Sequence, residues 1–95
     1  MMDIEQIEIL LVEDSPLDAE LTMRGLKEDK VANNVVWLKD GQQALDYVFR
    51  DGAYKDRTAP DPRLILLDLK MPRVDGIEVL RAIKANAATR HIPVV

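Results

Sequence analysis

Short apolar runs rich in β-branched residues alternate along this chain with longer stretches of helical periodicity. The apolar runs lie at residues 7–12, 35–38, 64–67 and 92–95. They are nearly continuous in apolar residues, which is typical of strands covered on both faces in a parallel sheet. The helical stretches between them span residues 16–28, 42–50 and 77–85. The order β-α-β-α-β-α-β predicts an α/β fold with a parallel sheet, right-handed crossovers and helices on both faces.

The first helix is expected to turn one apolar face toward this sheet. Leu17, Leu21 and Gly25 are spaced at i, i+4 and i+8 and therefore share a face. Gly25 weakens a helix by about 1 kcal/mol relative to Ala. A close approach of the helix to the sheet at Gly25 is the expected compensation.

Residues 51–62 form the longest predicted connection. Glycine and proline stand there among charged residues, which indicates a loop. A loop of this length is unusual in a compact domain and is expected to be functional or mobile. The charges of residues 54–57 are expected to form a solvated face.

Length and charge limit the functions that this chain can have. Its 95 residues are enough for one small domain, residues 1–95. With 13 basic and 17 acidic residues the net charge is −4, which argues against binding nucleic acid or an anionic membrane through bulk charge. Cys is absent, so disulfides, thiolate metal sites and Cys nucleophiles are excluded, and a cytoplasmic location fits. No apolar run approaches the roughly 20 residues needed to span a bilayer.

Carboxylates follow two of the predicted strands. Glu13 and Asp14 follow the first strand, and Asp68 follows the third. If these strands are neighbours, the three carboxylates converge at one edge of the sheet and repel one another unless a cation lies among them. Such an oxygen-rich site suits Mg²⁺, and a hard cation beside an Asp suits phosphoryl transfer. The alternative remains open that Asp14 with Ser15 only caps the first helix and that Asp68 only starts a turn.

Two single residues invite a functional interpretation that the sequence does not favour. His91 is the only histidine, and a lone histidine before a strand is expected to be structural. Trp37, on the second strand, is expected to contribute packing rather than a platform for a ligand.

Two motifs give the chain a resemblance to the receiver domain of two-component response regulators. The acidic pair Glu13-Asp14 after the first strand is one, and the stretch from Asp68 to Gly76, with its Met-Pro and Asp-Gly pairs, is the other. The resemblance implies a flavodoxin-like (CheY-like) fold with strand order 2-1-3-4-5. The loop 51–62 resembles that of stand-alone receivers whose partners are phytochrome-type sensor histidine kinases.

The resemblance also implies roles for individual residues. Asp68 is the implied phosphoacceptor, and Glu13, Asp14 and Asp68, with the backbone carbonyl of Lys70, are the implied Mg²⁺ ligands. Three further residues are implied to shape the loop: Met71, Pro72 and Gly76, the glycine by adopting a backbone conformation that other residues resist. The family's remaining site residues, a Ser or Thr and a Lys, would lie beyond Val95. The segment is therefore expected to be the N-terminal portion of a longer receiver.

The sequence leaves three possible functions for this chain. The first is a phosphoacceptor module that takes a phosphoryl group from a histidine kinase and is not an enzyme beyond its own phosphorylation and slow dephosphorylation. The second is an interaction module that keeps the fold without the chemistry. The third is an Asp-nucleophile phosphohydrolase, although Lys70 stands where such enzymes carry a second Asp. Because an interrupted sheet leaves an open edge, association of the isolated segment as a homodimer or by strand exchange is expected.

Overall fold

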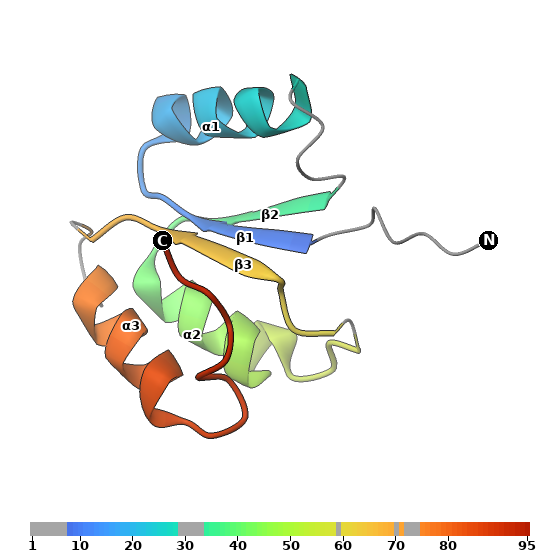
Figure 1. Ribbon diagram of the computed structural model, residues 1–95, viewed down its shortest axis with the longest axis vertical. Coiled ribbons are helices and arrows are strands. Elements are labelled where there is room, and N and C mark those ends of the chain that lie inside the picture. The colour runs from blue at the N-terminus through green and yellow to red at the C-terminus, as the bar shows by residue number, and fades with distance from the viewer. Residues whose placement is uncertain (1–7, 29–33, 59, 70, 72–74) are drawn as a thin grey trace.

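The computed structural model describes residues 8–28, 34–58, 60–69, 71 and 75–95. Its elements follow the predicted order (Figure 1). They are β1 (Glu8–Val12), α1 (Pro16–Glu28), β2 (Asn34–Leu38), α2 (Gly41–Phe49), the 3₁₀ turn η1 (Gly52–Tyr54), β3 (Leu64–Leu67) and α3 (Gly76–Ala85). None of the helices in these described ranges is long and apolar enough to cross a membrane.

The strands form a parallel sheet in the order β2-β1-β3, so the predicted neighbourhood of the first and third strands is confirmed. The register pairs Val12 of β1 with Leu38 of β2 and with Leu67 of β3. The predicted fourth strand is represented by a parallel bridge between Val94 and Ile65. Central β1 thus lies with its carboxyl end beside the carboxyl ends of both neighbours.

Helices cover both faces of this sheet, with α1 on one face and α2 and α3 on the other (Figure 1). Side chains alternate between the faces along each strand. The main core lies on the α2–α3 face, where Leu10 and Val12 pack with Ile65 among residues of both helices. On the α1 face, Ile9 and Leu11 are buried.

The prediction that Leu17, Leu21 and Gly25 form the face of α1 that packs on the sheet is wrong. Leu17 and Leu21 are 65% and 55% exposed, whereas Ala19 is fully buried. A Cβ atom on Gly25 would meet nothing within 4 Å, so the expected close approach at Gly25 is absent. The helix instead approaches the sheet at Ala19, because a small side chain lets its backbone come near.

The predicted solvated face at residues 54–57 is confirmed for Lys55 and Asp56, which are exposed, and is wrong for Arg57. The Arg57 side chain is only 6% exposed. Its Nε donates to the Tyr47 carbonyl at 2.9 Å, and its guanidinium lies 4.2 Å from the centroid of the Tyr47 ring. The Tyr47 hydroxyl donates to the Glu8 carboxylate, and the Tyr54 ring packs edge-on against Tyr47 with centroids 5.1 Å apart. We call Glu8, Tyr47, Tyr54 and Arg57 the aromatic cluster; it ties the loop to the start of β1.

Candidate functional site

Three carboxylates meet where β1 and β3 end. Glu13, Asp14 and Asp68 each offer one carboxylate oxygen, and these oxygens all lie within 4.8 Å of one another. The backbone N–H of Asp68 donates to the Val12 carbonyl at 3.0 Å, which ties the two strand ends together. We call these three residues the acidic site. The predicted convergence of the three side chains is confirmed.

The turn from β1 into α1 presents two of the three carboxylates. The Glu13 carboxylate accepts a hydrogen bond from the Ser15 N–H at 3.1 Å. The Ser15 hydroxyl accepts from the Asp18 N–H at 3.3 Å and so caps α1. Because Ser15 provides the cap, the exposed Asp14 carboxylate is not needed for it. The geometry therefore favours a ligand role for Asp14 over a capping role.

The electrostatics of the acidic site favour a cation. Burial raises the pKa of the Glu13 carboxyl, and the negative charges of Asp68, Asp18 and Asp14 raise it further, while the hydrogen bond from Ser15 acts in the opposite direction. Glu13 therefore keeps its proton more readily than an isolated Glu does. A hard divalent cation would relieve this repulsion, and an all-carboxylate donor set fits Mg²⁺.

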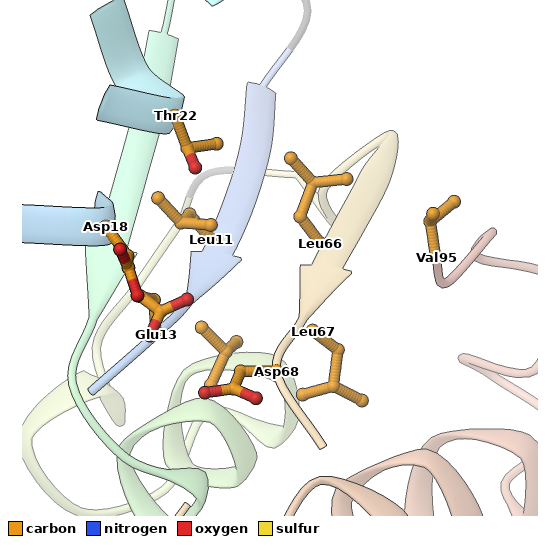
Figure 2. A pocket seen from close by; sticks show the side chains of 9 residues that line it. Leu11, Glu13, Asp18, Thr22, Leu66, Leu67, Asp68 and Val95 are labelled. Atoms are coloured by element: carbon orange, nitrogen blue, oxygen red, sulfur yellow. The ribbon is translucent and has the colours of Figure 1, made fainter. Parts of the chain in front are cut away.

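A pocket of about 390 Å³ opens beside the acidic site on the α1 face of the sheet (Figure 2). It has an acidic end and an apolar floor. Its lining residues are Leu11, Val12, Glu13, Asp18, Thr22, Leu66, Leu67, Asp68 and Val95. The carboxylates of Glu13 and Asp68 are thus reachable from outside the sheet.

The connection from β3 to α3 begins at the phosphoacceptor candidate. Met71 is 7% exposed and packs into the core, which anchors the connection. Lys70 and Pro72 lie outside the described residues, so their predicted roles stay predictions. The helix then begins with a capping box, in which Asp75 accepts from the Glu78 N–H and Glu78 from the Asp75 N–H.

Gly76 is required here for a different reason from the predicted one. Its φ is not in the left-handed region, which among the described glycines is occupied by Gly52. Instead, a Cβ on Gly76 would collide with the Asp68 carbonyl oxygen and lie 2.5 Å from the Leu69 Cα. The absence of a side chain therefore lets α3 start directly against the backbone of Asp68.

Sequence reasoning missed one contact at the site. The indole Nε1–H of Trp37 donates to the Glu13 carbonyl at 2.7 Å, so this side chain does more than pack. The sequence indicated only that Trp37 lies near the site, since it stands one residue before the end of a strand that neighbours β1. Side-chain reach across the sheet edge cannot be read from such a pattern.

Comparison with known proteins gives consistent matches. The profile of the response regulator receiver domain matches residues 9–95. Response regulator Rcp1 of Synechocystis sp. is 44% identical over 87 residues, which cover 92% of this chain and 58% of that protein. The chain thus spans little more than half the length of this relative.

Solved structures of similar proteins have the same fold. The bacteriophytochrome response regulator AtBRR is 51% identical with a TM-score of 0.89, covering 95% of this chain and 64% of that one. The phosphorylated cyanobacterial phytochrome response regulator RcpA is 40% identical with a TM-score of 0.85, covering 94% and 62%. The Mn²⁺-bound form of Rcp1 is 42% identical with a TM-score of 0.84, covering 93% and 62%.

Proposed function

The chain belongs to the response regulator receiver family, and we propose that it accepts a phosphoryl group on Asp68 from the phosphohistidine of a sensor histidine kinase. The observation that carries this proposal is the acidic site, where Asp68 meets Glu13 and Asp14 within 4.8 Å at the open end of the sheet. The likeness to phytochrome response regulators supports a phytochrome-type kinase as the partner. Such a partner and the lack of cysteines fit a cytoplasmic location.

In the proposed reaction, a carboxylate oxygen of Asp68 attacks phosphorus in line with the P–N bond of the phosphohistidine. The new O–P bond makes an acyl phosphate, and the electron pair of the broken P–N bond stays on the imidazole nitrogen. Glu13, Asp14, Asp68 and the Lys70 carbonyl would hold Mg²⁺, which neutralises charge on the transferring group. Met71 and Gly76 keep the connection after Asp68 in place, and the role of Pro72 in shaping it stays a prediction.

The donor set has support from a relative, because the similar Rcp1 was solved in an Mn²⁺-bound form. A phosphorylated relative, RcpA, likewise supports phosphorylation. The phosphohydrolase alternative is weaker, because Lys70 occupies the place of the acid/base Asp. The interaction module without chemistry is weaker because the three carboxylates are kept together.

The decisive experiment is to incubate the full-length protein that carries this chain with Mg²⁺ and a small phosphodonor, and to follow its intact mass. One base-labile phosphate per chain is expected, and Asp68→Asn should abolish it. The matched control is Asp56→Asn, an exposed residue of the loop after α2, which should leave phosphorylation unchanged. Continuous turnover of the donor would indicate a phosphohydrolase, and the absence of any label would indicate an interaction module.

Metal binding is tested separately by isothermal titration with MgCl₂. Asp14→Asn should weaken binding more than Glu13→Gln, because the Glu13 carboxylate already accepts a hydrogen bond from Ser15 whereas Asp14 extends into solvent. A folded protein that shows no heat of Mg²⁺ binding would contradict the assignment.

A further inference from the structure

The Glu13 residue is held by β2 through its backbone on both sides. Its N–H donates to the Leu38 carbonyl at 3.0 Å, which continues the parallel ladder one residue beyond β1. Its carbonyl accepts from the Trp37 indole at 2.7 Å. Trp37 and Leu38 at the end of β2 therefore both hydrogen-bond to the backbone of Glu13 in the acidic site.

The position of Trp37 makes this contact possible. In the sheet register Trp37 lies opposite Leu11, two residues before Glu13, so its long side chain reaches forward along β1. The chain after β2 turns away into α2, whose first turn is capped by Asp40. A side-chain donor thus meets the Glu13 carbonyl at the point where the sheet ends.

The outer side of the indole is also covered. The Lys39 ammonium lies 5.5 Å from the centroid of the Trp37 ring, within the range of a cation–π contact. The hydrogen bond to the Glu13 carbonyl and this contact with Lys39 together restrict the rotamer of the ring. The donor is therefore oriented before any ligand binds.

The carbonyl of Glu13 and the N–H of Asp14 belong to one rigid peptide plane. Fixing the carbonyl fixes the orientation of this peptide plane and therefore restricts the position of the Asp14 Cα, from which the Asp14 side chain extends. We propose that Trp37 is a positioning residue that preorganises the β1–α1 turn for a divalent cation. It acts through the Glu13 carbonyl and does not itself touch the cation. This inference rests on the function proposed above.

The test isolates the N–H group from the bulk of the ring. Incorporation of benzothienylalanine at position 37 replaces the N–H by sulfur and keeps the size and shape of the ring. Titration with MgCl₂ should then give a Kd about two- to tenfold weaker than that of the natural chain, which is the usual net value of one hydrogen bond. Val35→Ala is the matched control, because it removes packing from the same face of β2 without touching Glu13 and should leave the Kd unchanged.

A second readout in EDTA does not depend on metal binding. Hydrogen exchange at the Ser15 amide, whose N–H is bonded to the Glu13 carboxylate, should be faster in the benzothienylalanine protein than in the natural one. Unchanged exchange together with an unchanged Kd would overturn the proposal. If the natural chain itself bound no Mg²⁺, the proposed function would fail, and exchange at Ser15 would still decide: faster exchange supports the positioning of the turn by Trp37, and equal exchange overturns it.

Discussion

At the edge where the strands begin, the Glu8 carboxylate accepts a hydrogen bond from the Tyr47 hydroxyl, whereas at the edge where they end, three carboxylates face one another. In the aromatic cluster, the negative charge of Glu8 is balanced by the positive charge of the Arg57 guanidinium, which stacks on the Tyr47 ring. The acidic site gathers like charges, which raise the pKa of Glu13 on top of the effect of burial. The comparison teaches that one edge gives stability by satisfying its charge internally, and that the other gives up stability to remain ready for a cation.

The largest effect is expected in the aromatic cluster. Arg57→Ala removes the hydrogen bonds to the Tyr47 and Pro60 carbonyls, the ion pair with Asp61 and the stacking on Tyr47. We expect a loss of about 2–4 kcal/mol in the free energy of unfolding, because charged hydrogen bonds and cation–π contacts both disappear. Urea denaturation measures it, with Lys55→Ala in the same loop as the control. Mg²⁺ affinity should not change; a change would show that the two edges are coupled.

Gly76→Ala is expected to disturb the acidic edge instead. The new Cβ would collide with the backbone of Asp68 and Leu69, at a cost of about 1–3 kcal/mol in stability and with weaker Mg²⁺ binding. Gly25→Ala is the matched control, because its Cβ has open space in a helix and should stabilise by about 0.5–1 kcal/mol. Equal effects of the two substitutions would contradict the assigned role of Gly76.

Alkaline pH should act on the aromatic cluster through Tyr47. Burial and the neighbouring Glu8 raise the pKa of Tyr47 to about 12. The folded state thus holds the phenolic proton more tightly than the unfolded state does, with its ordinary pKa near 10. The resulting stabilisation is complete below pH 10 and is lost as the pH rises to about 12. Unfolding measured at pH 8, 10 and 12 should show this loss in the natural chain, and Tyr47→Phe should show a smaller one.

The smallest effect is expected for Glu13→Gln in the absence of metal. Because the pKa of Glu13 is raised, ionisation of this group costs stability as the pH rises above 4.5, the usual Glu value. The amide oxygen can still accept from Ser15, so the substitution removes charge and keeps the turn. We expect a gain of about a few tenths of a kcal/mol at pH 7, the scale of exposed charge interactions. Added Mg²⁺ should reverse the order of the melting temperatures, so that the natural chain melts above the Glu13→Gln variant. If the order stayed the same, Glu13 would not be a ligand of the cation.

The sequence was sufficient for the strands of the sheet, because apolar runs indicate them directly. The residues alone left the meeting of Glu13, Asp14 and Asp68 conditional on the first and third strands being neighbours, and it was the resemblance to receiver domains that supplied the strand order. It failed for α1, where Leu17 and Leu21 have helical spacing but are exposed, while the helix is buried at Ala19. It also failed for Arg57, since a charged side chain in a loop is buried only when an aromatic partner and carbonyl acceptors are brought to it by the fold. Contacts between distant residues, such as Trp37 with Glu13, depend on side-chain reach, which periodicity does not record.

The central place of β1 in the parallel sheet has a consequence for biosynthesis. The strand leaves the ribosome before β2 and β3, and its second partner β3 follows about 55 residues later (residue 64 against residue 9). At the usual translation speed this is a delay of about 3–11 s. During that time the apolar run Ile9–Val12 lacks its full set of neighbours, so nascent chains of this protein are candidates for chaperone binding at β1.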